Sequence, residues 1–421
     1  MQTYHVSYGT DEAPFAASAI KRPKELPMVR QQSAAMTEKL KLLSKTGPDT
    51  EMGRLLRRFW QPVATSHSVK PGQAKPLRAM GEDLTLYRGE SGKAHLVAGR
   101  CAHRLTLLHT GWVQGDEIRC MYHGWKYDGA GQCTEAPAEG PASAARIRIA
   151  AYPVYEYCGL IFAYLGEGAP PAFDLPRKDA FEQSGLIMFA RIQVWPCNWF
   201  QMIENSLDAV HVSFVHLAGK VGPFGEAVTA AIPKLEYTET DAGIRQVATR
   251  SATNVRVSDW SFPNNNHIVT PGRTKDSPWV HRGVWNVPVD DTHTYKVGVY
   301  AIPSVSPEAD RVTVEHFENY GDYNPADHHD ELFVDKQWPE DPSLQLTPAQ
   351  DYVAMMGQGT IVDRSEELLG KSDAGIMLLR KIFWRELEAL RSGRPTKVWR
   401  RLKHAEEMPT QGDRPKAMAQ P

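Results

Sequence analysis

The chain has 421 residues, of which 42% are hydrophobic, so it can bury a sizeable core and form two domains. Its 48 basic and 50 acidic residues give a formal net charge of −2, which argues against binding to nucleic acid or to an anionic membrane surface. The five cysteines show no disulfide pattern and no stretch approaches the roughly 20 apolar residues of a membrane span, so a reducing cytoplasm is the expected location.

The first part of the chain predicts a small all-β domain. Residues 1–50 are polar and are expected to form an N-terminal extension. A helical pattern over 52–60 is followed by a hairpin pattern over 84–97, with a turn flanked by glycines. A run of glycines and prolines that begins at Gly166 breaks regular structure. The predicted β domain therefore spans 51–170.

A first group of metal-ligand residues lies inside this domain, where Cys101-Ala-His103 is followed by Cys120-Met-Tyr-His123. Two thiolates and two imidazoles suit either a tetrahedral zinc ion or a Rieske centre, in which two histidines replace two cysteines on one iron of a [2Fe-2S] cluster. Zinc fingers usually group cysteine with cysteine and histidine with histidine. Here each loop carries one of each, so each iron would receive one ligand per loop, which favours the Rieske centre.

The rest of the chain predicts a second domain over 171–405. Strand-like runs occur around 234–250 and 279–302, and an apolar-periodic run over 376–390 predicts a final long helix. The tail over 406–421 is polar, contains prolines and is expected to be flexible. Strands in the first domain and a sheet with helices in the second indicate the α+β class.

A second group of candidate ligands follows an apolar-periodic stretch that starts at Asn198 and is expected to be helical. Asp208 and His211 would share one face of that helix, whereas His211 and His216 would lie roughly 140° apart around it. Both imidazoles can bind one metal only if the helix ends or loosens between them. Two histidines and one carboxylate form the facial triad of non-haem Fe(II) oxygenases, which leaves coordination positions open. A polar helix face without a metal is the alternative for this pair taken alone.

Together the two groups resemble the oxygenase component, or α subunit, of the Rieske non-haem iron aromatic ring-hydroxylating oxygenases, and the phthalate-dioxygenase-like branch in particular. The resemblance extends from about Met52 to Leu390. Ala102 and Leu105 depart from it, because relatives often have Pro and Gly at these places, but all four cluster ligands are kept. The resemblance implies a Rieske domain followed by a catalytic domain with a helix-grip fold, in which a sheet wraps around a long helix.

The resemblance also implies the third ligand of a mononuclear Fe(II), and it assigns this role to Asp373 just before the final helix. A helix cap formed by Ser372 or Asp373 is the structural alternative. Three other carboxylates lie close enough in the sequence to replace Asp373 as the ligand, namely Asp363, Glu366 and Glu367.

Asp208 is implied to link His211 to His123 of a neighbouring chain, so that electrons pass from the cluster of one subunit to the iron of the next. Such a head-to-tail interface closes into a ring, expected to be a homotrimer or a multiple of a trimer. An ordinary surface or capping aspartate is the alternative. Asn205, and with it Glu204, is expected to lie beside the metal or on the helix surface.

The implied function is that of an oxygenase component that uses dioxygen to dihydroxylate or monohydroxylate a carboxylated aromatic compound. Oxidative removal of O- or N-methyl groups is the alternative on the same scaffold, and a Rieske electron-transfer protein or a zinc-stabilised binding protein is the non-enzyme alternative. Gly357-Gln358-Gly359 lacks the third glycine of a dinucleotide fingerprint, so the electrons are expected from an NAD(P)H-dependent flavin and iron-sulfur reductase, with or without a ferredoxin. Cations that could pair with a substrate carboxylate, with surface solvation as the alternative for each, are Lys220, Arg245, Arg250, Arg273 and Arg282.

Overall fold

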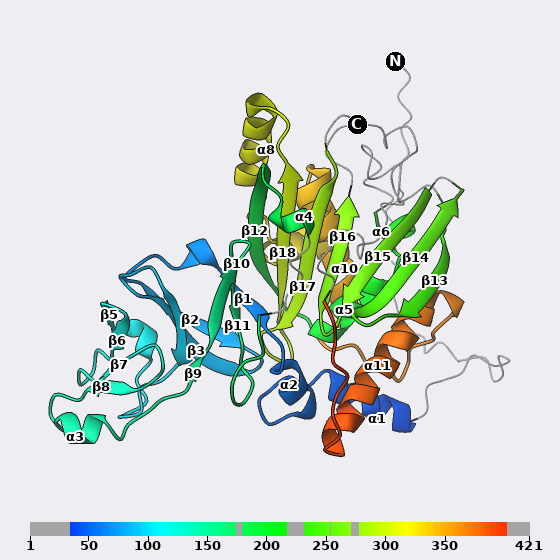
Figure 1. Ribbon diagram of the computed structural model, residues 1–421. Helices are drawn as coiled ribbons and strands as arrows, with labels where there is room; N and C mark the ends of the chain where they lie inside the picture. Colours follow the sequence, from blue (N-terminus) through cyan, green and yellow to red (C-terminus); the bar gives the residue numbers. More distant parts are fainter. Residues whose placement is uncertain (1–33, 174–178, 217–230, 253, 271–277, 402–421) are drawn as a thin grey trace, which may run out of the picture.

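The computed structural model describes residues 34–173, 179–216, 231–252, 254–270 and 278–401. Three small sheets form an elongated β-rich part at one end, and a seven-stranded sheet with helices forms the larger part at the other end (Figure 1). This arrangement confirms the predicted α+β class. The proposed domain limits remain predictions, and the tail over 406–421 lies outside the described residues.

The β-rich part contains eleven short strands between residues 61 and 163, all paired antiparallel. The three sheets are β1-β11-β10, β2-β3-β4-β9 and β5-β6-β7-β8. In chain order the strands are β1 (Gln61–Thr65), β2 (Ala74–Ala79), β3 (Glu82–Arg88), β4 (Ala94–Ala98), β5 (Trp112–Gln114), β6 (Glu117–Arg119), β7 (Lys126–Tyr127), β8 (Cys133–Glu135), β9 (Ala151–Tyr152), β10 (Val154–Tyr157) and β11 (Leu160–Ala163), and a short helix, α3 (Pro141–Ala144), follows β8.

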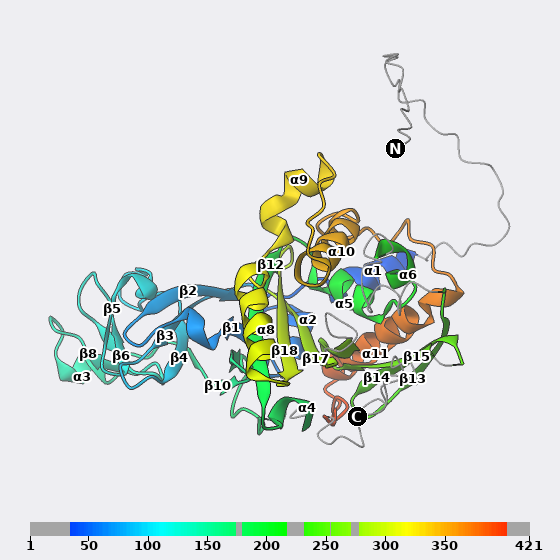
Figure 2. The same cartoon turned by 90° about the horizontal axis from the view of Figure 1, so that it is seen from above.

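The larger part is built on one antiparallel sheet of order β12-β18-β17-β16-β15-β14-β13. Its strands are β12 (Leu186–Trp195), β13 (Lys234–Glu239), β14 (Gly243–Ser251), β15 (Asn254–Ser261), β16 (Asn265–Thr270), β17 (Val280–Pro288) and β18 (Thr294–Pro303). Its helices are α4 (Asp179–Glu182), α5 (Trp199–Leu207), α6 (Val212–Val215), α8 (Pro307–Tyr320), α9 (His329–Phe333), α10 (Thr347–Met356) and α11 (Ala374–Arg391). Figure 2 shows α5, α6 and α10 together at the end of the molecule that lies away from β5–β8.

The helix-grip core follows from the spacing of apolar residues on α11. Leu379, Ile382, Phe383 and Leu387 recur at intervals of three and four residues and are fully buried. They share one core with Phe200 of α5, where the Phe200 and Phe383 ring centroids lie 5.5 Å apart. The long final helix is therefore held between α5 and the sheet.

The polar N-terminal stretch contributes to this core through its last part. Residues 34–43 form α1, and its Leu40 and Leu43 are buried in the same core as α11. A second helix, α2 (Glu51–Leu56), begins at the N-cap Thr50, whose side chain accepts a hydrogen bond from the Gly53 backbone N–H. The expected extension is thus packed against the larger part from residue 34 onward.

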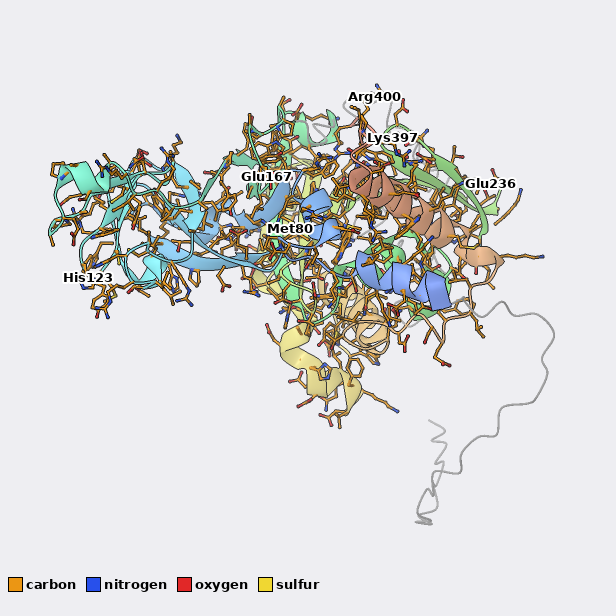
Figure 3. All side chains as sticks on the ribbon, turned by 90° about the horizontal axis from the view of Figure 1, so that it is seen from below. Met80, His123, Glu167, Glu236, Lys397 and Arg400 are labelled. Carbon is orange, nitrogen blue, oxygen red and sulfur yellow. The ribbon has the colours of Figure 1, made fainter. Side chains whose placement is uncertain are left out.

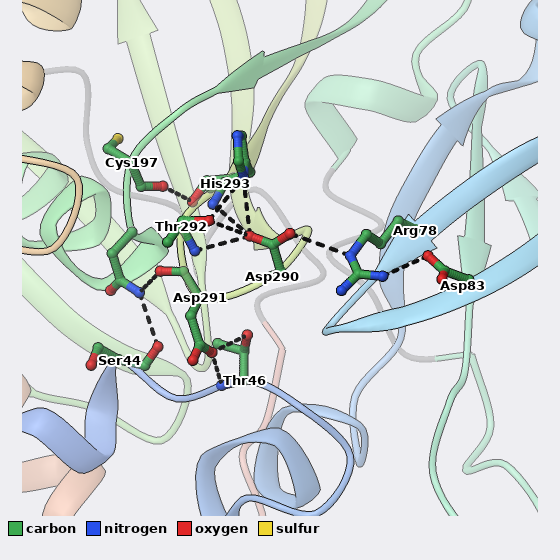
Figure 4. Close-up of polar contacts among 11 residues, drawn as sticks. Ser44, Thr46, Arg78, Asp83, Cys197, Asp290, Asp291, Thr292 and His293 are labelled. Atoms are coloured by element: carbon green, nitrogen blue, oxygen red, sulfur yellow. Dashed lines mark hydrogen bonds and ion pairs between the residues drawn. The ribbon is translucent and has the colours of Figure 1, made fainter.

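The turn between β17 and β18 joins several parts of the chain (Figure 4). Asp291 Oδ1 accepts hydrogen bonds from the Thr46 backbone N–H at 2.8 Å and the Thr46 hydroxyl at 3.1 Å. Its neighbour Asp290 forms an ion pair with Arg78 of β2 at 3.3 Å. Asn198, which caps α5, donates to the carbonyl oxygen of Asp291 at 2.7 Å. The turn therefore ties the β-rich part, the N-terminal segment and the start of α5 to one sheet edge.

Candidate metal centres

The first predicted ligand group lies on two loops that face each other. Cys101 and Cys120 are buried, and the His103 and His123 rings lie edge to face with their centroids 4.4 Å apart. Each loop therefore contributes one cysteine and one histidine. The two cysteines lie next to each other without a disulfide, and so do the two histidines. Burial raises the pKa of the Cys101 thiol in the metal-free chain, and the neighbouring Cys120 raises it further.

The surroundings of these four side chains fit a Rieske cluster. Nδ1 of His103 is buried without a hydrogen-bond partner, as expected of an atom reserved for a metal. The hydroxyl of Tyr127 lies 3.2 Å from Cys101 Sγ, where it can donate to a thiolate. The ring of Trp125 stacks on His103 at 4.6 Å. These features hold the ligands in place and exclude water from one side of the cluster.

Leu105 has an unusual backbone conformation in the first cluster loop. Its φ is +61°, a left-handed conformation that glycine adopts without strain. The loop still closes, because the Leu105 N–H donates to the Cys101 carbonyl at 3.0 Å and the Arg100 guanidinium donates to the Leu105 carbonyl at 2.9 Å. The first cluster loop therefore holds a leucine in a backbone conformation that is unfavourable for residues other than glycine.

The second predicted ligand group lies where the helix breaks. α5 ends at Leu207, and Asp208 Oδ1 accepts hydrogen bonds from the backbone N–H groups of Val210 at 2.8 Å and His211 at 3.3 Å. This Asx turn interrupts the helix, and the single turn of α6 then separates His211 from His216. The main break therefore precedes both histidines, and the short helix α6 ends at Val215, just before His216; the two ring centroids lie 5.6 Å apart.

The structure brings a different carboxylate to these histidines than the one expected. Asp351 on α10 forms a group with His211 and His216 in which the potential ligand atoms lie within 4.8 Å of one another. Its Oδ1 lies 3.6 Å from His211 Nε2 and 3.4 Å from His216 Nε2, and it is buried without a hydrogen-bond partner. Two imidazoles and one orphaned carboxylate oxygen are the donor set that suits Fe(II).

The expectation for Asp373 is therefore corrected. Asp373 precedes α11, and its Oδ2 accepts a hydrogen bond from the Gly370 backbone N–H at 2.6 Å, which caps the short turn that leads into the helix. The alternatives Asp363 and Glu367 do not join the histidines either. Asp363 accepts from the Ser365 N–H at 3.0 Å, and Glu367 pairs with Arg380 at 2.7 Å. Asp373 therefore caps the start of the helix, which was the structural alternative to binding the metal.

The electrostatics of the site keep Asp351 ionised. Burial alone would raise the pKa of Asp351, but Lys296 and the two histidines hold it well below its usual range. Burial lowers the pKa of Lys296, and Asp351 opposes that shift. In the metal-free chain, burial lowers the pKa of His211, but Asp208 and Asp351 outweigh it and raise the pKa to about 9. Asp351 therefore presents an anionic oxygen to the space between the two histidines.

Each histidine is oriented by a second contact at its other ring nitrogen. Oδ2 of Asp208 lies 3.6 Å from His211 Nδ1, and Oε1 of Gln350 lies 3.1 Å from His216 Nδ1. Both Nε2 atoms therefore point toward Asp351. Asn205 lies at the same place, with its Nδ2 3.4 Å from His211 Nε2. Asp208 and Asn205 thus both lie beside His211, and their catalytic roles stay predictions.

Glu204 has neither of the roles expected for it. Its buried carboxylate accepts from Arg364 at 2.6 Å and from Arg380 at 2.7 Å, which ties α5 to α11. Burial would raise the pKa of Glu204, but the two guanidinium groups lower it. The ion pairs therefore stabilise the fold above the ordinary pKa of a glutamate, and this contribution is lost as the pH falls through the depressed value.

We expect Glu204→Gln to lower the free energy of unfolding by about 3–5 kcal/mol, because two buried guanidinium groups lose their shared anion. Denaturant unfolding monitored by far-UV circular dichroism measures this loss. Glu236→Gln is the matched control, since Glu236 is exposed and pairs with Lys234 on the surface. Equal stabilities of the two variants would contradict a structural role for the network.

The two candidate centres lie far apart within one chain. Figure 3 shows His123 at the outer end of the β-rich part, whereas α5, α6 and α10 stand in the other part (Figure 2). The side chains around the cluster loops include four large apolar residues that are exposed, Leu105 at 63%, Trp112 at 54%, Met121 at 50% and Tyr122 at 53%. The cluster therefore faces outward behind an apolar surface.

Comparisons with known proteins agree with this geometry. Residues 59–153 match the family model of the Rieske [2Fe-2S] domain. The chain is 34% identical over 367 residues to the 5,5'-dehydrodivanillate O-demethylase oxygenase subunit of Sphingobium sp. (strain NBRC 103272 / SYK-6), covering 85% of this chain and 81% of the relative. It is 29% identical over 382 residues to the phthalate 4,5-dioxygenase oxygenase subunit of Pseudomonas putida, covering 84% and 86%.

A solved structure shows the same fold. The carbazole-bound oxygenase in the ferredoxin complex of carbazole 1,9a-dioxygenase superposes with a TM-score of 0.60 at 21% identity, over 88% of this chain and 97% of the other. Within the part of this chain that the structure describes, no helix is long and apolar enough to cross a membrane.

Proposed function

Since this chain belongs to the Rieske non-haem iron oxygenases, as an oxygenase subunit similar to those of the phthalate-dioxygenase-like branch, we propose that it hydroxylates a carboxylated aromatic compound with dioxygen at a mononuclear Fe(II). The observation that carries the proposal is the convergence of His211, His216 and the orphaned Oδ1 of Asp351 in a chain that also holds a Rieske domain. When bound, the cluster supplies single electrons and the ferrous ion supplies open positions for dioxygen.

The protein's own residues hold this machinery in place. Cys101, His103, Cys120 and His123 are the proposed ligands of the cluster. Asp208 and Gln350 orient the two iron-binding imidazoles through Nδ1, so that both Nε2 atoms and Oδ1 of Asp351 face one point. Asn205 adds an amide beside His211. Burial of His216 and Asp351 limits the access of water to that point.

Cations on the sheet support the proposal that the substrate carries a carboxylate. Arg282 pairs across strands with Tyr300, on the face of β17 and β18 that also carries Lys296 beside the metal site. Its Nε is buried without a hydrogen-bond partner. Arg245 is already paired with Asp259 at 3.0 Å and is therefore a poorer candidate. Lys220 and Arg273 lie outside the described residues.

Oxidative demethylation is the second candidate, because the relative at 34% identity is named an O-demethylase. Both reactions need the same two metal centres, and the position of the substrate carbon decides between them. The proposed electron source is an NAD(P)H-dependent reductase, directly or through a ferredoxin, as supported by the ferredoxin complexes of carbazole 1,9a-dioxygenase. A cytoplasmic location is proposed because none of the five cysteines forms a disulfide.

We further propose a homotrimer, or a multiple of one, in which each cluster serves the iron of a neighbouring chain. Two features support it. The cluster and the iron site stand at different ends of one chain, and the exposed apolar residues around His123 form a surface that a second chain would bury. The side chain of Asp208 is 28% exposed, so a neighbouring chain can reach it.

We expect the purified protein to be red-brown and to contain about three irons per chain, two in the cluster and one mononuclear. With a reductase, NADH and labelled dioxygen, a panel of aromatic acids and their methyl ethers should yield one class of product. Two labelled oxygens on a ring indicate dihydroxylation, one indicates monohydroxylation, and formaldehyde release indicates demethylation. Colourless protein that contains zinc would refute the oxygenase proposal.

A further inference from the structure

The two carboxylate oxygens of Asp351 face different partners. Oδ1 points to the Nε2 atoms of His211 and His216, at 3.6 Å and 3.4 Å. Oδ2 lies 3.6 Å from Nζ of Lys296, which comes from β18 on the opposite side of the carboxylate. An aspartate can bind a metal through one oxygen or through both, and the second mode uses one more coordination position.

Lys296 has a second contact that places its ammonium at this position. Its Nζ lies 3.9 Å from the centroid of the Trp195 indole, so the ammonium is placed between an aromatic face and the carboxylate. Trp195 is fully buried on the neighbouring strand β12, and its ring packs edge to face against Tyr352 at 5.4 Å. Because Tyr352 directly follows Asp351 on α10, Trp195 contacts both the lysine and the turn that carries the carboxylate.

We propose that Lys296 is a positioning residue that engages Oδ2 of Asp351, so that the carboxylate offers the metal a single oxygen. This inference rests on the proposed function, because it assumes ferrous iron between the two histidines and Asp351. For Oδ2 to reach the metal as well, the carboxylate must rotate away from the half-buried ammonium of Lys296, which then loses this anion. Lys296 therefore keeps a coordination position open that the reaction needs.

The test replaces Lys296 with methionine, which keeps the length and apolar stem of the side chain but removes the cation. We expect Lys296→Met to retain the Rieske signal and the mononuclear iron, because Asp351 remains available and now chelates through both oxygens. Nitric oxide, which binds ferrous iron at an open position, should bind about tenfold or more weakly. Anaerobic nitric oxide titration followed by electron paramagnetic resonance measures both the affinity and the shape of the signal.

Two further variants complete the design. Lys234→Met is the matched control, since Lys234 is exposed on β13 and forms a surface ion pair with Glu236, and it should behave as the unmodified protein. Lys296→Arg restores a cation and should recover much of the nitric oxide affinity. Unchanged nitric oxide binding in Lys296→Met overturns the inference. Loss of the mononuclear iron from this variant also overturns it, because Lys296 would then be needed for metal binding itself. Absence of mononuclear iron from the unmodified protein would instead overturn the proposed function and the inference together.

Discussion

Asp351→Asn is expected to abolish oxygenation while the Rieske signal stays intact. The substitution keeps the shape of the side chain but removes the anionic oxygen that faces His211 and His216 at 3.6 Å and 3.4 Å. A neutral amide binds Fe(II) poorly, so we expect most of the mononuclear iron to be lost and turnover to fall by about 100-fold or more. Iron analysis together with product formation measures the two effects.

Asp373→Asn is the matched control, because it makes the same chemical change at the carboxylate that the sequence pointed to. Asp373 accepts a backbone hydrogen bond from Gly370, and an asparagine side-chain oxygen can accept it as well. We therefore expect about one mononuclear iron per chain and nearly unchanged turnover. The opposite pattern, with iron lost from Asp373→Asn and kept in Asp351→Asn, would return the ligand role to Asp373.

The contrast between these two aspartates shows what a sequence can and cannot reveal. The Rieske motif and the final long helix each depend on residues that are close in the chain, so spacing was sufficient to predict them, whereas the helix was expected to continue through Asp208 and instead ends at Leu207. The third ligand depends on which distant helix folds over the two histidines. That choice is made by packing, here by α10 lying against α5 and α6.

One local signal could have drawn attention to Asp351. It stands in a mostly apolar run that follows Thr347-Pro348, a pattern that is typical of a helix start, and the structure buries its neighbours Ala349, Gln350 and Tyr352. A carboxylate on a turn that is otherwise buried needs a partner, either a cation or a metal. Asp373 stands instead at a helix start, where aspartate is common without any metal. Its capping position was the better guide to its role.

Lys296 and Glu204 illustrate the same limit for charged residues. Lys296 lies in a strand, and nothing in its neighbourhood along the chain links it to Asp351. Glu204 stands one residue from Asn205 on α5, yet the two side chains take different directions, one toward Arg364 and Arg380 and the other toward His211. Sequence proximity to a metal ligand therefore identified Asn205 correctly as a neighbour of the site and misplaced Glu204.

Electron transfer between chains gives the other large expected effect, through Asp208→Asn. The asparagine oxygen can still accept the Val210 N–H and keep the Asx turn, but the negative charge that faces His211 Nδ1 at 3.6 Å is lost. We expect both metals to stay bound while the single-turnover rate of cluster oxidation falls by about 100-fold. Stopped-flow absorbance of the cluster, with substrate and dioxygen present, measures this rate. An unchanged rate would contradict the bridging role.

Mixed oligomers assign this effect to one chain of the interface. Chains with Cys101→Ser lack a cluster and chains with Asp351→Asn lack the mononuclear iron, so neither should be active alone. Co-expressed in equal amounts, they should recover about a quarter of the normal activity if electrons cross between chains, because each interface needs one chain of each kind in the right order. Adding Asp208→Asn to the Cys101→Ser chain, which holds the iron, should remove the recovered activity, whereas adding it to the Asp351→Asn chain should have no effect. Absence of any recovered activity in the mixture would show that the electrons stay within one chain.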